Sequence, residues 1–159
     1  MHILLCRRIM AVCLAALLTG CGFYGHKAEP LPQAGAKHKI VRTAYSQVGK
    51  RYKSGGDSPK KGFDCSGLVW WSYGQHGVKI PRTTTEQAKT GKKVERSAAK
   101  PGDIVVFRTS HSPRGLHTGI YAGAHKFIHS PTSGKTVCLD NLAGYWGSKL
   151  VAIRRIGAN

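Results

Sequence analysis

The spacing of apolar residues predicts helices in the first half of the folded part of the chain, between residues 38 and 91. Between residues 38 and 48 apolar side chains recur at helical intervals, and Gly49 is placed to end the helix. A second apolar run predicts a helix over residues 64–75. A short third helix is expected to begin at Thr83, which has the capping-box spacing to Glu86.

The pattern changes after residue 100 to short β-branched runs between glycine turns, which is typical of consecutive strands. Helices followed by a run of strands favour an α+β class, with the helices packed on an antiparallel sheet of about five to six strands. The expected strands cover residues 103–107, 116–121, 125–130, 135–139 and 149–155.

The N-terminus has the pattern of a secretory leader. Arg7 and Arg8 precede an apolar run over residues 9–18, which is too short for a comfortable membrane span and suits a signal peptide over residues 1–20. The run ends in Leu-Thr-Gly-Cys, which resembles a bacterial lipobox, so we expect Cys21 to be lipidated and to anchor the protein in a membrane.

The leader is expected to be followed by an unstructured tether and then by a folded domain. Gly22 follows the lipidated cysteine, and the absence of aspartate at that position resembles the pattern that sorts lipoproteins to a bacterial outer membrane, so we expect the protein there, facing the periplasm. Residues 21–37 contain Pro30, Pro32 and several glycines without periodicity, and predict a tether. Residues 38–159 are then the folded domain.

The charge of the chain points to an anionic partner or surface. Lysine and arginine total 25 against 7 acidic residues, which gives a formal charge of +18. There is no zinc-finger spacing, RRM motif or concentrated basic helix, so nucleic acid is not the expected partner. A membrane surface or a polyanionic cell envelope fits equally well.

The five cysteines, at positions 6, 13, 21, 65 and 138, include no C-x-x-C pair. This spacing argues against a metal site, and no cofactor is expected. Once the leader is removed and Cys21 is lipidated, Cys65 and Cys138 remain as thiols, and we expect them to stay unpaired.

Cys65 stands at the start of an apolar helical run. The unpaired N–H groups and the dipole at a helix N-terminus favour a thiolate, so the thiol pKa is expected to fall and Cys65 becomes a candidate nucleophile. The same N–H groups could hold an oxyanion. A small buried core residue is the alternative interpretation.

A thiol nucleophile needs a base and a group that orients the base. A hairpin centred on Gly123 would bring His117 directly opposite His129, so we assign His117 as the base and His129 as the orienting group. His111, in the loop over residues 108–116 that precedes His117, is a weaker alternative base, and His125 could join a histidine cluster.

Several motifs together resemble the NlpC-type family of papain-like cell-wall peptidases. They are Phe63-Asp64-Cys65-Ser66-Gly67-Leu68-Val69, Ile80-Pro81-Arg82-Thr83, Lys100-Pro101-Gly102-Asp103-Ile104-Val105, His117-Thr118-Gly119-Ile120-Tyr121 and Phe127-Ile128-His129. The resemblance implies a papain-like fold and cleavage of peptidoglycan stem peptides by a Cys65, His117, His129 triad. It also implies that Tyr52 assists the oxyanion and that Asp64, Ser66 and Arg82 line the substrate groove.

The resemblance leaves the scissile bond open between the D,D crosslink and the γ-D-glutamyl–diamino acid bond. Thr118 stands where the family usually has valine, and the loop over residues 108–116 is longer and more basic than the pattern requires. A non-catalytic wall-binding lipoprotein, an amidase and an acyltransferase on the same fold are the alternatives. We expect a monomer.

Overall fold

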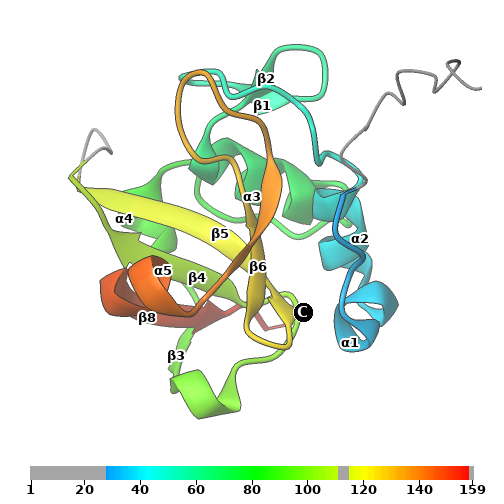
Figure 1. The fold of residues 1–159 in the computed structure, drawn as a ribbon. Coiled ribbons are helices and arrows are strands. Elements are labelled where there is room, and N and C mark those ends of the chain that lie inside the picture. The colour runs from blue at the N-terminus through cyan, green and yellow to red at the C-terminus, as the bar shows by residue number, and fades with distance from the viewer. Residues whose placement is uncertain (1–27, 111–114, 158–159) are drawn as a thin grey trace, which may run out of the picture.

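The computed structural model describes residues 28–110 and 115–157. A six-stranded antiparallel sheet with the strand order β3-β8-β4-β5-β6-β7 forms its centre (Figure 1). The predicted α+β class is therefore confirmed. The strands of this sheet are β3 (Lys92–Val94), β4 (Ile104–Arg108), β5 (Leu116–Gly123), β6 (Lys126–His129), β7 (Cys138–Asn141) and β8 (Leu150–Arg155).

The helices in the described part of the chain lie on both sides of this sheet (Figure 1). They are α1 (Gln33–Lys37), α2 (Lys39–Tyr45), α3 (Cys65–Gly74), α4 (Thr84–Gln87) and α5 (Gly144–Lys149). None of the helices in the described ranges is long and apolar enough to cross a membrane.

The two faces of the sheet are buried against different partners, because successive side chains of a strand point to opposite faces. One face carries Ile104 and Ile120 and packs on apolar residues of α2 and α3. The other face carries Phe107 and Phe127 and packs on Trp146 of α5. Strand β4, whose first four residues are all buried, is thus covered on both sides.

Helix α3 begins where the sequence predicts, because its first turn is capped. The Asp64 carboxylate accepts a hydrogen bond of 2.6 Å from the backbone N–H of Gly67. A side chain at Gly67 would lie 2.0 Å from the carbonyl oxygen of Gly56, so only glycine lets this turn pack on the preceding loop. The helix then packs mainly against β5.

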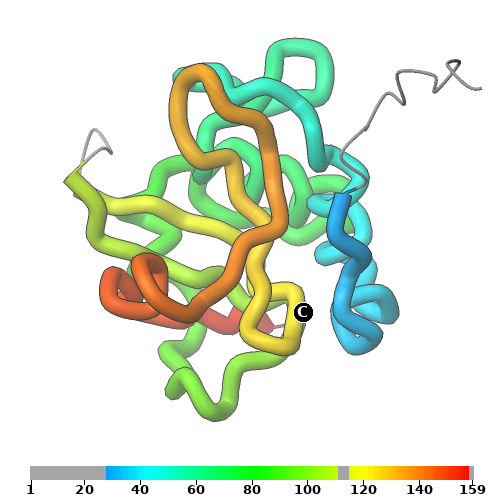
Figure 2. Tube along the Cα trace, in the orientation of Figure 1, coloured from blue at the N-terminus to red at the C-terminus, as the bar shows by residue number. Residues whose placement is uncertain are grey.

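The end of the predicted tether is ordered. Helix α1 occupies residues 33–37, and Gly35 is buried where a Cβ would lie 2.2 Å from the carbonyl oxygen of Ala122 in β5. Figure 2 shows this segment in blue beside the yellow end of the β5–β6 hairpin. The leader, the lipidation residue Cys21 and the start of the tether lie outside the described residues.

Four small elements, namely β1, β2, β3 and α5, were missed by the sequence pattern. The expected loop over residues 50–61 contains β1 (Asp57–Ser58), which pairs with β2 (Gly62–Phe63). Strand β3 is short and lysine-rich with exposed residues, and α5 contains two glycines and no side-chain cap, so neither has a periodic apolar signal. The expected strand over residues 135–139 lies later, as β7.

Candidate active site

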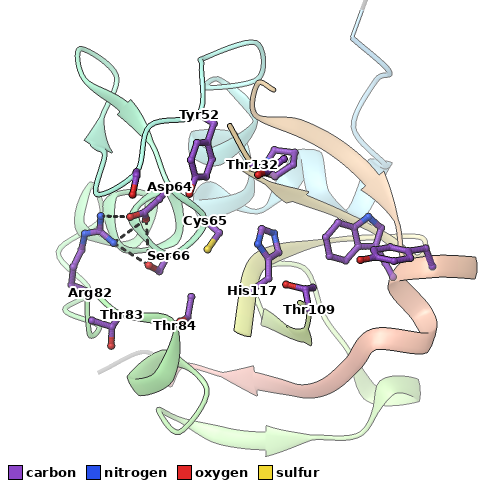
Figure 3. A pocket seen from close by; sticks show the side chains of 14 residues that line it. Tyr52, Asp64, Cys65, Ser66, Arg82, Thr83, Thr84, Thr109, His117 and Thr132 are labelled. Atoms are coloured by element: carbon purple, nitrogen blue, oxygen red, sulfur yellow. Dashed lines mark hydrogen bonds and ion pairs between the residues drawn. The ribbon is translucent and has the colours of Figure 1, made fainter. Parts of the chain in front are cut away.

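Cys65 lies at the first position of α3 and faces a cleft of about 260 Å³. The residue is 8% exposed, so the sulfur is almost completely buried beside this cleft. Figure 3 shows the sulfur pointing toward the imidazole of His117, which comes from the start of β5. The structure therefore brings together the predicted nucleophile and the predicted base. The cleft is lined by Tyr52, Ser54, Asp64, Cys65, Ser66, Arg82, Thr83, Thr84, Thr109, His117, Pro131, Thr132, Tyr145 and Trp146.

His129 contacts His117, as predicted, although the two strands pair in a different register from the one expected. The Nε2 atom of His117 lies 2.8 Å from Nδ1 of His129, and the two rings meet edge to face with their centroids 5.0 Å apart. Both imidazoles are buried. This contact leaves Nδ1 of His117 as the ring nitrogen that can serve Cys65.

The hairpin register differs from the one expected. Ile120 pairs with Ile128 and Tyr121 with Phe127, and the same register places His129 opposite Gly119. The expectation that His129 lies directly opposite His117 is therefore wrong by two residues.

The reason for this shift is the position of the turn. It is formed by Ala124 and His125, which both have positive φ, and a bulge lies between Tyr121 and Gly123. Because a shift of two residues keeps each side chain on its face, the two histidines still meet. His125 is an exposed turn residue and does not join them.

The polar chain continues beyond His129 to residues that the sequence pattern did not indicate. His129 Nε2 lies 3.3 Å from Oδ2 of Asp140, and the Trp146 indole N–H donates to the same oxygen over 2.9 Å. Trp146 also stacks on His117, with ring centroids 5.2 Å apart and planes 28° from parallel. The one available signal was an acidic residue directly after the predicted strand over residues 135–139, in a chain that has only 7 acidic residues.

Burial controls the protonation of the reacting pair. It raises the pKa of the Cys65 thiol, although backbone N–H groups of Thr118, Ser66 and Cys65 itself oppose this change. The expected fall in this pKa is thus wrong, because desolvation outweighs the effect of the helix start. Burial and the neighbouring His129 lower the pKa of His117 to about 3. The resting pair at neutral pH is therefore a thiol and a neutral imidazole.

Tyr52 lines the cleft beside Asp64 and Cys65 (Figure 3). Its backbone is held by a bridge to Phe63, just before the cysteine helix. Burial, and to a lesser degree the charge of a Cys65 thiolate, raise the pKa of its phenol, so Tyr52 stays a hydrogen-bond donor at neutral pH.

Asp64, Ser66 and Arg82 form a bonded network along the same cleft (Figure 3). Arg82 donates to both carboxylate oxygens of Asp64, over 3.0 and 2.9 Å, and to the Ser66 hydroxyl over 3.0 Å. It also donates to the carbonyl of Gly56. The three predicted substrate residues are thus brought together, and they also fix the start of α3.

Thr118, where the family usually has valine, is buried and has a polar partner. Its hydroxyl donates to the side chain of Gln87 over 3.0 Å, and Gln87 in turn donates to the backbone carbonyls of Ser66 and Pro81. The substitution thus connects β5 to α4 without entering the cleft. His111, the alternative base, lies outside the described residues.

One group of side chains in the described ranges could hold a metal ion. Donor atoms of His129, Cys138 and Asp140 lie within 4.8 Å of one another. They already contact one another, because His129 Nε2 lies 3.5 Å from Cys138 Sγ and 3.3 Å from Asp140. The cluster is therefore explained by hydrogen bonds. Cys65 and Cys138 are both free thiols.

A helix-start cysteine that faces a histidine on an adjoining antiparallel sheet defines the papain-like class of thiol-enzyme folds. Residues 49–155 match the family model described as NlpC/P60 family. The chain belongs to the NlpC/P60 family, which confirms the resemblance seen in its motifs.

Curated relatives of the chain include several cell-wall enzymes. Murein DD-endopeptidase MepH of Escherichia coli K12 is 42% identical over 114 residues, which are 69% of this chain and 42% of MepH. Gamma-DL-glutamyl hydrolase of Bacillus subtilis 168 is 40% identical over 134 residues, 84% of this chain and 32% of that protein. The chain thus spans less than half of these two relatives. Probable endopeptidase NlpC of E. coli K12 is 36% identical over 151 residues, 89% of this chain and 94% of that protein.

Solved structures with the same fold include other members of the NlpC/P60 family. The NlpC/p60 domain of the peptidoglycan hydrolase SagA gives a TM-score of 0.64 at 34% identity, over 77% of this chain and 98% of that one. An NlpC/P60 family protein from Bacillus cereus ATCC 10987 gives a TM-score of 0.68 at 29% identity, over 79% and 41%. The fold assignment is therefore supported at the level of both sequence and structure.

Proposed function

We propose that this protein is a peptidoglycan hydrolase, a cysteine endopeptidase that cuts stem-peptide amide bonds through a thioester. The observation that carries the proposal is the cleft in which the Cys65 sulfur faces His117, while His129 holds the other nitrogen of that imidazole. The named activities of the relatives MepH and gamma-DL-glutamyl hydrolase support the same substrate class.

The reaction follows from the protonation of the resting pair. His117 Nδ1 takes the Cys65 proton as the sulfur attacks the amide carbon, so that a C–S bond forms and the carbonyl oxygen becomes an oxyanion. The Cys65 backbone N–H and the Tyr52 hydroxyl stabilise this oxyanion. His117 then gives its proton to the leaving amine as the C–N bond breaks. Water, deprotonated by the same imidazole, hydrolyses the thioester and releases the acid.

Asp64, Ser66 and Arg82 are proposed to contact the stem peptide, because they form the wall of the cleft beside the sulfur. The ion pair of Arg82 and Asp64 is partly exposed, with 30% of the Arg82 side chain and 17% of the Asp64 side chain accessible to solvent. Polar atoms of the pair are therefore available to a ligand. The scissile bond is either the D,D crosslink or the γ-D-glutamyl–diamino acid bond, since relatives named for each exist.

The protein is proposed to act as a lipoprotein of the bacterial outer membrane, facing the periplasm and anchored through Cys21. The support is the leader and the lipobox-like residues in the sequence. The reacting groups come from one chain, which favours a monomer. Metabolic labelling with a palmitate analogue tests the anchor, and label that persists in Cys21→Ala would refute it.

Digestion of purified sacculi tests the activity. The full chain and its Cys65→Ala variant are incubated with sacculi, and the released muropeptides are identified by mass. The expected result is new products from the wild-type chain and a loss of about 10³-fold or more in Cys65→Ala. Cys138→Ala serves as the matched control, because it removes a free thiol outside the cleft.

The masses of the products also decide between the alternatives. A product pair split at the crosslink identifies a D,D-endopeptidase, and a pair split after γ-D-glutamate identifies the other bond. Sugar strands freed of peptide would identify an amidase instead. Binding to sacculi without any new product from a folded chain would refute the endopeptidase proposal in favour of a binding module.

A further inference from the structure

The contacts of the two histidines extend in a continuous line to Asp140. His117 Nε2 faces His129 Nδ1 at 2.8 Å, and His129 Nε2 faces Asp140 Oδ2 at 3.3 Å. The carboxylate stands at the β7 end of this line, and the Cys65 sulfur stands at the other (Figure 3 shows the sulfur end). Each link requires one donor and one acceptor, so the protons along the line are coupled.

The positions of the ring protons decide which atom donates and which accepts in each of these hydrogen bonds. For His117 Nδ1 to accept a proton from Cys65, the proton of this neutral ring must be on Nε2, which then donates to His129. His129 Nδ1 must accept, so its own proton is on Nε2. That N–H needs an acceptor at the far side, and the Asp140 carboxylate provides one.

We propose that Asp140 is a positioning residue that fixes the tautomers of both histidines and so leaves His117 Nδ1 free to act as the base. The proposal rests on the proposed function for its consequence in catalysis. The tautomers themselves also follow independently from the other end of the line, because the ionised Asp140 carboxylate can only accept and so requires the His129 proton on Nε2.

Trp146 holds the carboxylate in this role. An indole N–H can only donate, and it donates to the same Oδ2 that faces His129. The backbone N–H of Asn141 donates to the other oxygen over 3.2 Å. Its bonds to His129 and to Trp146 hold the pKa of the Asp140 carboxyl below its ordinary value, so this acceptor is ionised at neutral pH.

Cys138 is the competing acceptor, since its sulfur lies 3.5 Å from the same His129 nitrogen. Sulfur is a weak acceptor, and a carboxylate forms the stronger, charge-assisted bond. Burial, together with the charge of Asp140, raises the pKa of the Cys138 thiol to about 11, so no thiolate competes at neutral pH. The carboxylate therefore decides the tautomer.

Nitrogen-15 NMR of the histidine rings tests the proposal in the full chain carrying Cys65→Ala, without substrate. The parent chain is expected to carry the ring proton on Nε2 in both His117 and His129. Asp140→Ala is expected to move the His129 proton to Nδ1 in a large fraction of molecules, with His117 following. Cys138→Ala and the surface variant Asp57→Ala, which loses only an exposed pair with Lys61, are the matched controls and should keep the parent tautomers.

Asp140→Asn adds a variant that preserves shape. The Trp146 donor should turn the amide oxygen toward itself and toward His129, so the single variant keeps the parent tautomers. The double variant Asp140→Asn with Trp146→Phe frees the amide to rotate and should lose them. This pair keeps the test valid if Asp140→Ala does not fold.

Activity is measured separately on sacculi, with Cys65 restored. Asp140→Ala is expected to lower the rate about 10- to 100-fold. Parent tautomers that survive in Asp140→Ala, or that change in Cys138→Ala instead, would overturn the positioning role even if the wild-type chain digests sacculi. Tautomers that change as expected in a chain that digests nothing would support the positioning role and refute the endopeptidase.

Discussion

Gly119 lies against His129 so closely that a Cβ at position 119 would come 3.2 Å from the Cβ of His129. The same Cβ would come 2.8 Å from the carbonyl oxygen of Ile128 and 2.9 Å from the ring of Phe127. Gly119 shares a face of the sheet with His117, two residues earlier on β5. The missing side chain therefore leaves the space in which the two imidazoles meet.

Gly119→Ala is expected to separate the histidines. Three close contacts surround the new methyl group, two of them with backbone and packed ring atoms, so the variant should lose about 1–3 kcal/mol of stability. Most of the activity on sacculi should be lost as well, because His129 must move away from His117. Urea unfolding and sacculus digestion at a temperature where the variant is folded measure the two effects.

Gly74→Ala is the matched control for this change. Gly74 is in α3 with nothing within 4 Å of a built Cβ, so alanine should stabilise the helix by about 0.5–1 kcal/mol and leave activity intact. Full activity in Gly119→Ala would contradict the account of the histidine contact.

The meeting of His117 and His129 could be predicted because strand alternation depends only on whether a shift is odd or even. The turn centre was misplaced by one residue, which shifts the strand pairing by two residues, so the two histidines stayed on the same face despite the error in register. The position of Cys65 could be predicted because Asp64 is a strong helix cap. Both inferences rest on local chemistry.

The Asp140 contact could not be predicted in the same way. Asp140 reaches His129 because β7 pairs with β6 in a register that puts Phe127 beside Asp140 and His129 beside Cys138. The Ser133-Gly134 turn indicates a reversal of the chain there, but it does not fix the register of the strands it connects, and β7 begins later than the apolar pattern suggests. The prediction that the Cys65 pKa falls was wrong for a related reason. Burial of the thiol raises its pKa, and burial depends on the whole fold.

Stability should fall as the pH is lowered, because the two histidines are buried as neutral rings. Burial lowers both pKa values, and the Asp140 carboxylate opposes this only for His129. Below about pH 6.5 the unfolded chain takes up protons that the folded chain does not, so the free energy of unfolding decreases. For His117 the loss is about 1.4 kcal/mol per pH unit and continues toward pH 3.

Urea unfolding between pH 7.5 and 4.5 measures this slope. His117→Gln should unfold with a shallower dependence on pH than the wild type, and His125→Asn, which removes an exposed imidazole at a turn, is the control. An equal slope in His117→Gln and wild type would show that His117 is protonated in the folded chain as readily as in the unfolded one.

Alkylation of Cys65 should be slow at neutral pH in the free protein. Its thiol pKa is raised by burial, and the neutral imidazole of His117 supplies no positive charge to stabilise a thiolate. In a Cys138→Ala chain the rate with iodoacetamide should rise about tenfold per pH unit from pH 7 to beyond 9. A rate that is already at its plateau between pH 5 and 7 would reveal a resting thiolate–imidazolium pair instead.

Asp64 and Arg82 should be coupled in stability, whatever else they do for the substrate. Asp64 caps α3, accepts from the backbone N–H of Gly55 and forms a partly buried ion pair with Arg82. Asp64→Ala should cost about 1–3 kcal/mol, because it removes the cap and leaves the guanidinium of Arg82 without its charge partner.

A double-mutant cycle separates this structural role from substrate binding. The cycle of Asp64→Ala with Arg82→Ala should give a coupling of about 1 kcal/mol or more in urea unfolding, because both charges are partly desolvated. The exposed pair of Asp57 and Lys61 is the matched control and should give about 0.5 kcal/mol or less. A coupling near zero at Asp64 and Arg82, together with a raised KM in each variant, would mean that the pair serves the stem peptide and not the start of the helix. Coupling without any change in KM would mean the reverse.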